Sequence, residues 1–218
     1  MMRILFLSGL GQGGAERQVI ETARALAEND IEVTIMTFNI DNCFYELPAR
    51  IKVLQLDKRK GINHYLPKGV RKVSALFRMR RVIGKEKPDY VISYITKLNA
   101  SLGIVGLTMP LRNTVFLASE RTTELRYMSS RKWRWICKIA YKGIDGFFTN
   151  NFVTKDRMAM HLDINPTKIK VLRNIIDTNT FAPDLSRKED LFQYAPSVAV
   201  ENLSILVSGK IEIHRMDK

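Results

Sequence analysis

Four glycines stand close together near the amino terminus, namely Gly9, Gly11, Gly13 and Gly14. They follow an apolar run, residues 4–7, and precede a segment from Ala15 whose apolar residues recur with a helical period. Glycine permits a sharp turn and lets a ligand approach the backbone closely. The first amides of a helix lack intrahelical partners and lie at the positive end of its dipole, so they attract an anion. We therefore predict a strand, a glycine loop and a helix that together bind a phosphate-bearing ligand such as a nucleotide derivative.

The same glycines allow two other interpretations. Gly9, Gly11 and Gly14 satisfy G-x-G-x-x-G, the dinucleotide-binding pattern, so an NAD(P)-binding oxidoreductase domain is one alternative. That pattern expects an acidic residue at the end of the second strand, but the next apolar run ends on Thr37, Phe38 and Asn39, and Asp41 comes late. The other alternative is a glycine turn that serves only the tight packing of strand against helix.

Further polar side chains follow later apolar runs. The sequence Ser119-Glu120-Arg121-Thr122 ends one run, at the place where doubly wound sheets bind ligands. The alternative for this segment is a Glu–Arg pair that only caps the next turn. Asn150 and Asn151 end a later run, and there we predict a helix cap.

The elements that must position these residues alternate along the chain. Strand-like runs lie at residues 3–8, 32–38, 51–56, 89–95, 114–119, 145–150 and 168–173, and helical patterns lie at 14–28, 68–83, 97–109, 129–141 and 153–162. This alternation predicts an α/β fold with a doubly wound, mainly parallel, Rossmann-like sheet and helices on both of its faces. We expect Asn29 to end the first helix in a left-handed conformation, and Gly84 and Pro88 to stop the helix of residues 68–83.

The basic charge of the chain is clustered. The net charge is +13, and residues 58–87 and 121–142 contribute +10 and +6, so the remainder is slightly acidic. Such clusters indicate an anionic partner, namely phospholipid headgroups, a lipid diphosphate or nucleic acid, with well-solvated helix faces as the alternative.

Two predicted helices carry these clusters. In the helix of residues 68–83 we expect an apolar stripe to pack on the sheet beneath a basic outer face that could lie at a membrane interface; the stripe comprises Val70, Val73, Leu76, Phe77 and Ile83. In residues 130–141, Trp133, Trp135 and Tyr141 alternate with basic residues. That alternation suits a membrane–water boundary, or stacking on nucleic acid.

Composition restricts the class of protein. Hydrophobic residues make up 45% of the 218 residues, which is ordinary for a globular chain. The two cysteines, Cys43 and Cys137, fit neither a disulfide framework nor a metal cluster and favour a reducing, cytosolic compartment. The first apolar run is too short for a signal peptide, and no run approaches the roughly 18 apolar residues of a membrane span.

Three segments together resemble a known family. Residues 13–17, Gly-Gly-Ala-Glu-Arg, with the helical segment after them and Glu32-Val33-Thr34, resemble the opening of retaining, family-4-type glycosyltransferases of GT-B architecture. Residues 168–177, followed by Phe181 and Pro183, are similar to the strand and N-G-I-D turn that close the first domain in that family. Residues 205–210, ILVSGK, are similar to the strand and Gly-Arg that open its second domain.

The resemblance implies a domain plan. Residues 1–182 would form the N-terminal, Rossmann-like, acceptor-side domain, residues 183–203 an interdomain linker, and residues 204–218 the first strand of an incomplete donor-binding domain. We expect the 218-residue chain to be inactive or nearly so alone, because half of a two-domain cleft would be missing.

The resemblance also implies roles for individual residues. Glu120 would be a carboxylate that orients the acceptor or donor, and Arg121 would be a weaker anion contact. A second set would bind the donor diphosphate or the acceptor, namely Gly11, Gly13, Gly14, Lys210 and Arg215. Lys210 and Arg215 each stand where the family has the other cation, and their alternative is a solvated chain end.

The function implied for the full-length enzyme is sugar transfer, with retention, from a nucleotide-sugar to a cell-surface glycan or a lipid-linked acceptor. The nucleotide-sugar is a co-substrate, and we expect no cofactor, no metal and no nucleic-acid partner. We expect a cytoplasmic location, with peripheral attachment to the inner face of the cell membrane through residues 58–87 and 121–142. The alternatives are the NAD(P)-binding domain and a non-catalytic short form that binds a membrane or a partner subunit.

Overall fold

The computed structural model describes residues 1–175, apart from positions 39, 41–42, 57–67 and 122–129. The side chains of Lys68, Arg71 and Lys72 lie outside this description as well. Residues 176–218 also lie outside it, so the predicted domain boundaries at 182 and 203 and the predicted strand from residue 204 stay predictions.

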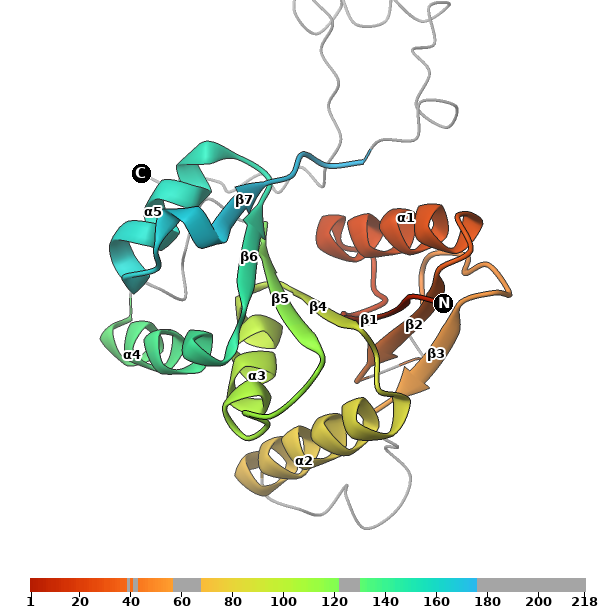
Figure 1. Ribbon diagram of the computed structural model, residues 1–218, viewed down its shortest axis with the longest axis horizontal. Coiled ribbons are helices and arrows are strands. Elements are labelled where there is room, and N and C mark those ends of the chain that lie inside the picture. Colours follow the sequence, from red (N-terminus) through yellow and green to blue (C-terminus); the bar gives the residue numbers. More distant parts are fainter. Residues whose placement is uncertain (39, 41–42, 57–67, 122–129, 176–218) are drawn as a thin grey trace, which may run out of the picture. The chain divides into compact units, whose positions relative to one another are not determined.

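The described residues form one seven-stranded sheet in the order β3-β2-β1-β4-β5-β6-β7, and every neighbouring pair is parallel (Figure 1). The strands are β1 (Arg3–Leu7), β2 (Glu32–Thr37), β3 (Lys52–Gln55), β4 (Tyr90–Tyr94), β5 (Val115–Glu120), β6 (Gly146–Thr149) and β7 (Ile169–Val171). The doubly wound, parallel sheet predicted from the alternating pattern is confirmed, and each predicted strand overlaps an observed one.

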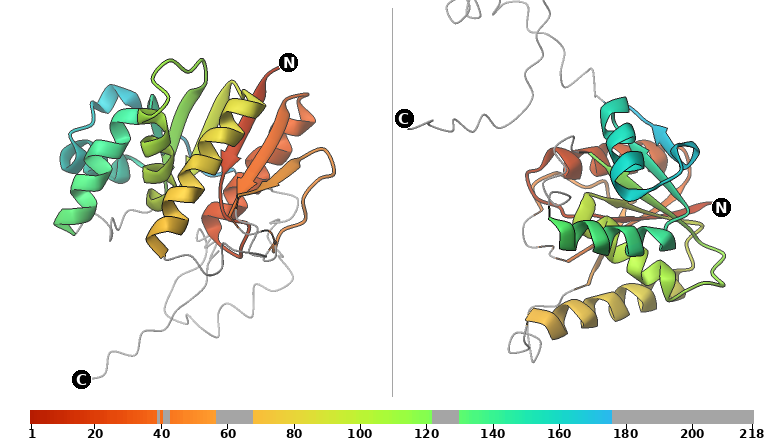
Figure 2. Two further views of the ribbon diagram at one scale, coloured as in Figure 1. Left: turned by 90° about the horizontal axis from the view of Figure 1, so that it is seen from below. Right: turned by 90° about the vertical axis from the view of Figure 1, so that its left-hand side faces the viewer.

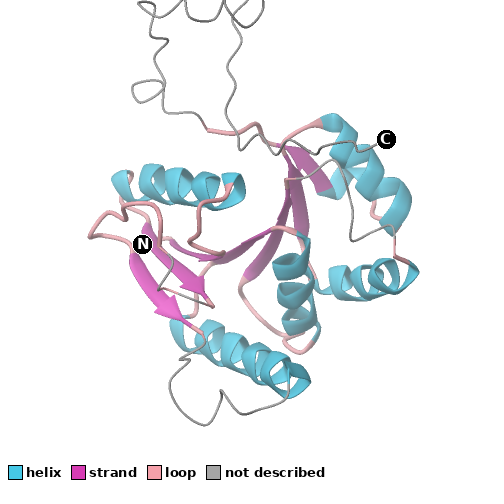
Figure 3. Ribbon diagram, turned by 180° about the vertical axis from the view of Figure 1, so that it is seen from behind, coloured by secondary structure: helices cyan, strands magenta, loops and turns pink. Residues whose placement is uncertain are grey.

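Helices cover both faces of this sheet (Figure 3). They are α1 (Gly14–Glu28), α2 (Lys68–Glu86), α3 (Thr96–Leu107), α4 (Arg131–Ala140) and α5 (Phe152–Leu162). The core is accordingly divided into two clusters, one beneath α1 and one shared by the other helices. Successive residues of a strand point to opposite faces. Ile4 and Phe6 of β1 therefore pack toward α1, while Leu5 and Leu7 pack in the other cluster.

Two predictions about helix ends were wrong in part. Gly84 does not end α2, which continues to Glu86; the chain then turns at Lys87, whose φ is +45°, before Pro88. Asn29 ends α1 as its C-cap, as predicted, but its φ is −101°, and the left-handed residue is Asp30, one position later. The Asn29 side chain donates to the carbonyl of Ala25 at 2.8 Å.

The predicted apolar stripe of α2 was wrong in part. The buried residues are Ala75, Met79 and Ile83, with Leu76 partly buried, whereas Val70, Val73 and Phe77 are exposed. The face of α2 that packs on the core is therefore not the one that carries Val70, Val73 and Phe77.

Glycine permits a close crossing between α3 and the end of α4 with the turn that follows it. A Cβ added at Gly103 would lie 2.2 Å from the carbonyl oxygen of Ala140, and one added at Gly106 would lie 2.1 Å from that of Gly143. Backbone meets backbone here, so the contact cannot be relieved by moving a flexible side chain. These glycines thus fix how α3 packs beneath the sheet.

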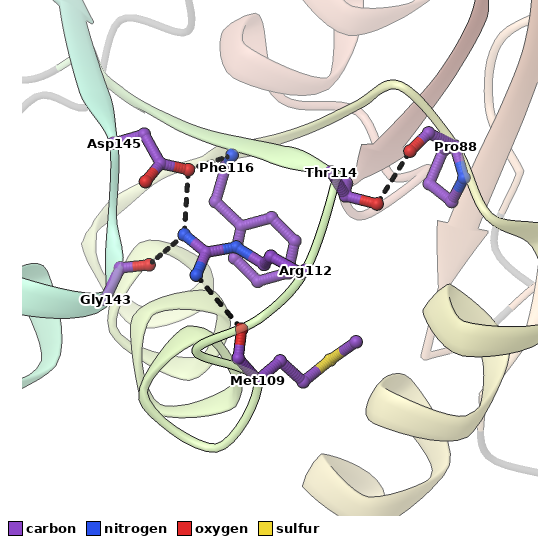
Figure 4. A network of polar contacts seen from close by, with 7 residues as sticks. All are labelled: Pro88, Met109, Arg112, Thr114, Phe116, Gly143 and Asp145. Carbon is purple, nitrogen blue, oxygen red and sulfur yellow. Dashed lines mark hydrogen bonds and ion pairs between the residues drawn. The ribbon is translucent and has the colours of Figure 1, made fainter.

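A network of polar contacts around Arg112 joins the amino ends of β5 and β6 (Figure 4). Arg112 donates to the Asp145 carboxylate at 2.8 Å and to the Gly143 carbonyl at 3.2 Å, and its guanidinium lies 4.3 Å from the centre of the Phe116 ring. The same carboxylate oxygen accepts the Phe116 amide at 2.7 Å. This network fixes the edge of the sheet opposite the carboxyl ends of the strands.

The glycine crossing yields a stability prediction. We expect Gly106→Ala to lower the free energy of unfolding by about 3 kcal/mol, because the new methyl group overpacks against backbone. Gly84→Ala is the matched control, since this helical glycine meets nothing within 4 Å, and it should gain about 0.5–1 kcal/mol from lower unfolded-state entropy. Urea unfolding of the two variants measures both values, and equal effects would contradict the assigned crossing.

Candidate functional site

The candidate site lies at the carboxyl edge of the sheet, where β1 and β4 are neighbours. The chain leaves β1 toward α1 on one face and leaves β4 toward α3 on the other. Doubly wound sheets bind ligands at such a switch point. The glycine loop after β1 and the residues after β4 and β5 are thereby brought to one edge.

The glycine loop is anchored on both sides. Leu10 is buried, and its carbonyl accepts the Phe44 amide at 2.9 Å. The Tyr45 hydroxyl donates to the Gly13 carbonyl at 3.3 Å. Gly13 is the N-cap residue of α1 and makes no side-chain cap, so the helix begins with backbone groups alone.

A carboxylate of the chain itself lies against this loop. A Cβ added at Gly13 would be 1.9 Å from Oε2 of Glu16, and one added at Gly9 would be 3.0 Å from Oε1. Glu16 occupies the third position of α1, where an acidic side chain is favoured by the helix dipole. Positions Gly11 and Gly14 meet nothing within 4 Å. An anion that binds the first amides of α1 must therefore share this space with the Glu16 carboxylate.

The end of β4 is fixed by buried polar contacts. The Ser93 hydroxyl donates to Oδ1 of Asn99 at 2.7 Å, and the Asn99 amide donates to the Ser119 carbonyl at 2.9 Å. Between them Ile95 has a φ of +67°, which is a strained conformation for a β-branched residue. The strain lies at the start of α3, and the Asn99 contacts tie this helix start to β4 through Ser93 and to β5 through Ser119.

Glu120 is the last residue of β5 and is only 1% exposed. One of its carboxylate oxygens accepts the Thr96 hydroxyl at 2.6 Å. Burial, and secondarily the Glu120 charge, raise the pKa of the Cys137 thiol to about 11 and raise that of the Tyr141 phenol well above its usual value. The carboxylate therefore lies within a buried polar group between β5, α3 and α4, and its contact with a sugar remains a prediction.

Arg121 is held in place by three uncharged groups. Its Nε donates to the Ser119 hydroxyl and its Nη1 to the Asn174 side chain, both at 2.8 Å. The guanidinium also lies 5.0 Å from the centre of the Tyr94 ring. Because none of these three partners carries a charge, the contacts orient the guanidinium without neutralising it, which suits an anion contact.

The segment after β7 returns to the glycine-loop helix. The Gln18 side chain donates to the Ile175 carbonyl and accepts the Ile175 amide, both at 2.8 Å. These two bonds join residues 157 positions apart and bring Asn174 and Ile175 to the same edge as Arg121. Sequence reasoning missed Gln18, Thr96 and Asn99, although each is a buried polar residue within an otherwise apolar helix face.

The other predicted residues divide as follows. Asn151 caps α5 by accepting the Thr154 amide at 2.8 Å, so the predicted cap is confirmed there. Lys210 and Arg215 lie outside the described residues, and their roles stay predictions. Where a dinucleotide-binding domain has an acidic residue, β2 ends on the buried, uncharged Thr37.

Neither a metal cluster nor a membrane span is evident in the described part of the chain. No group of three or more His, Cys, Asp or Glu residues lies there in a position to hold a metal ion. No helix within the same residues has the length and apolarity needed to cross a bilayer.

Comparisons with known proteins extend over most of the chain. The sequence profile of Glycosyltransferase Family 4 matches residues 12–180, a range that includes Gly13, Gly14, Glu120, Arg121 and Asn174. A Campylobacter jejuni enzyme is 30% identical over 148 residues, which are 66% of this chain and 39% of the relative. That enzyme is named GalNAc-alpha-(1->4)-GalNAc-alpha-(1->3)-diNAcBac-PP-undecaprenol alpha-1,4-N-acetyl-D-galactosaminyltransferase.

Solved structures share the fold at low identity. HepE of Anabaena, in complex with UDP and glucose, has a TM-score of 0.62 at 16% identity, over 89% of this chain and 50% of its own. Sucrose-phosphate synthase of Thermosynechococcus elongatus has a TM-score of 0.63 at 13% identity, over 88% and 52%. UDP-GlcNAc 2-epimerase of Methanocaldococcus jannaschii has a TM-score of 0.55 at 18% identity, over 80% and 46%.

These likenesses confirm the predicted Rossmann-like, GT-B type of fold for the described part of the chain. The chain spans about half the length of these structures and less than half that of the Campylobacter relative. An epimerase shares the fold, so the fold alone does not decide the reaction.

The Gln18 contact yields a prediction on local opening. We expect Gln18→Leu to remove both hydrogen bonds to Ile175, so that amide exchange at residues 172–175 becomes about tenfold faster or more, because each bond is worth about 1 kcal/mol. Hydrogen–deuterium exchange measured by mass spectrometry reports this. Gln12→Leu, at an exposed loop position, is the matched control and should leave the exchange unchanged.

The buried thiol yields a prediction on pH. The unfolded chain ionises Cys137 near the ordinary thiol pKa of 9.0, whereas the folded chain does so only near 11. The unfolded state therefore loses its proton first, and the free energy of unfolding should fall as the pH rises through that window. Cys137→Ala should show a smaller fall in urea unfolding, whereas Cys43→Ala, at the exposed cysteine, should follow the parent chain. An identical slope for the parent and Cys137→Ala would count against the shifted pKa.

Proposed function

Because the chain belongs to Glycosyltransferase Family 4, we propose that it forms the acceptor-side domain of an enzyme that transfers a sugar from a nucleotide-sugar to a glycan or lipid-linked acceptor. The transfer proceeds with retention of the anomeric configuration. The nucleotide-sugar is a co-substrate, and no resident cofactor takes part. The enzyme works in the cytoplasm.

The observation that carries this proposal is the family match across the whole carboxyl edge. Residues 12–180 include the glycine loop, the end of β5 and the segment after β7, which the described contacts of Arg121 and Gln18 bring to that edge. The Campylobacter relative is named for a lipid-linked acceptor, and HepE was solved with UDP and glucose. Both support a nucleotide-sugar donor and a glycan or lipid-linked acceptor.

Sugar transfer makes two demands on such a site. The leaving diphosphate must be neutralised, and the anomeric carbon must be held against an acceptor hydroxyl. In the proposal, the Gly13 and Gly14 backbone and the Arg121 guanidinium face anionic groups of donor or acceptor. Lys210 and Arg215 complete the set of cations for the diphosphate. Glu120 orients a hydroxyl of the acceptor or donor, held by Thr96.

Buried Glu120 sets a condition on that role. Its side chain is covered in the described structure, so the carboxylate acts directly only if ligand binding rearranges its cover. Without such a rearrangement it acts through the Thr96 hydroxyl at the start of α3 and is a positioning residue.

The proposal predicts acceptor binding by the 218-residue chain. A water-soluble, short-chain polyprenyl-diphosphate-linked N-acetylhexosamine is expected to bind in isothermal calorimetry. Arg121→Ala should weaken that binding about tenfold or more, because a hydrogen bond between charged groups is worth about 1.5–3 kcal/mol. Lys170→Ala, at an exposed position on β7, is the matched control for loss of one positive charge.

Two outcomes would contradict the proposed function. One is the absence of acceptor binding together with tight binding of NAD(P), which would favour the oxidoreductase alternative. The other is equal weakening by Arg121→Ala and Lys170→Ala, which would mean that only net charge matters.

A further inference from the structure

Helix α2 exposes an apolar stripe that the core does not use. Val70, Val73 and Phe77 are 49%, 53% and 68% exposed. Their spacing of three and four residues places them on one side of the helix. The other side already packs on the sheet layer through Ala75, Met79 and Ile83. The exposed stripe is therefore an additional apolar face of α2.

Positive charge surrounds this stripe. Arg80, Arg81, Lys85 and Lys87 are exposed along the second half of α2 and just beyond it. Residues 58–87 contain eleven Lys or Arg and a single acidic residue, Glu86, which is engaged by Lys52 at 2.7 Å. An apolar stripe flanked by basic side chains is typical of helices that lie in the interface of an anionic bilayer.

Helix α4, in the same layer of helices, also exposes apolar side chains beside basic ones. Trp135 and Ile139 are 66% and 37% exposed, beside the exposed Arg131 and Lys132. Helix α3 contacts both α2 and α4 and lies between them (Figures 1 and 2). Tryptophan beside basic residues suits the boundary between headgroups and acyl chains.

We propose that the outer sides of α2 and α4 form one surface that docks on an anionic lipid bilayer. We call it the α2–α4 surface, and its apolar members are Val70, Val73, Phe77, Trp135 and Ile139. The apolar side chains enter the acyl boundary while the basic side chains stay among the headgroups. This inference does not depend on sugar transfer.

A bilayer fits the surface better than a second copy of the chain. A twofold contact would place two strongly basic surfaces against each other, and like charges repel. An anionic bilayer supplies the opposite charge over an extended area, with about 1 kcal/mol for each basic residue near the surface. Apolar insertion and charge attraction then act together on the same helices.

Flotation with lipid vesicles tests the proposal on the full 218-residue chain. We expect binding to vesicles of phosphatidylcholine mixed with phosphatidylglycerol, no binding to phosphatidylcholine alone, and weaker binding as salt is raised. The double variant Val73→Ser and Phe77→Ser should bind about tenfold more weakly or worse, since two apolar side chains no longer enter the bilayer. Both residues are exposed, so the fold should persist.

The matched control is a second double variant, Leu111→Ser with Met160→Ser. These residues are 97% and 68% exposed and lie outside the α2–α4 surface, and their loss should leave vesicle binding unchanged. The part played by α4 has its own signal, because the two tryptophans of the chain, Trp133 and Trp135, both lie in α4. Their emission should shift to shorter wavelength when anionic vesicles are added.

Each other outcome overturns the proposal. Absence of vesicle binding, equal loss in the control variant, or equal binding to neutral vesicles would each do so. A parent chain that dimerises while the α2 variant stays monomeric would assign the stripe to a contact between copies. A tryptophan shift that survives the α2 double variant undiminished would restrict docking to α4.

Discussion

Parallel pairing of the seven described strands is the constraint on which the other features depend. Because all strands run in one direction, each connection between neighbours must cross a face of the sheet, and all carboxyl ends meet at one edge. That edge collects Gly13, Thr96, Glu120 and Ile175, which are far apart in the chain. The reversal in strand order between β1 and β4 sends α1 and α3 to opposite faces, and so leaves the start of each helix facing the edge.

Polar side chains make this edge rigid where it is buried. A buried polar group is costly unless it is hydrogen-bonded, so Asn99 and Glu120 fit only an arrangement that satisfies them. That requirement can hold Ile95 in a conformation which alone would be unfavourable. The contacts of Gln18 with Ile175 and of Arg121 with Asn174 differ, because they hold an exposed segment, and exposed hydrogen bonds are the ones that local opening breaks first.

Local pattern predicted the elements well and the contacts between them poorly. Strands and helices followed from the apolar period, because it acts within a few residues of the chain, whereas the breaker Gly84 does not end α2. Helix α2 shows the limit: Val70 and Met79 lie on opposite sides of it, and both sides are apolar. Only packing against the sheet decides which side is buried. The pairing of Gln18 with Ile175 spans 157 positions, and no local pattern encodes it.

The parallel fold also links the candidate site to the basic helices. A helix that follows a parallel strand begins at the carboxyl edge, so the first turns of α2 and α4 start at the same edge as the glycine loop. Val70 and Val73 lie in the first two turns of α2, and Arg131 and Lys132 open α4. A bilayer bound by these turns would lie near that edge. If both the proposed sugar transfer and the proposed docking hold, a lipid-linked acceptor in that bilayer would lie on the same side of the molecule as the edge that carries Arg121.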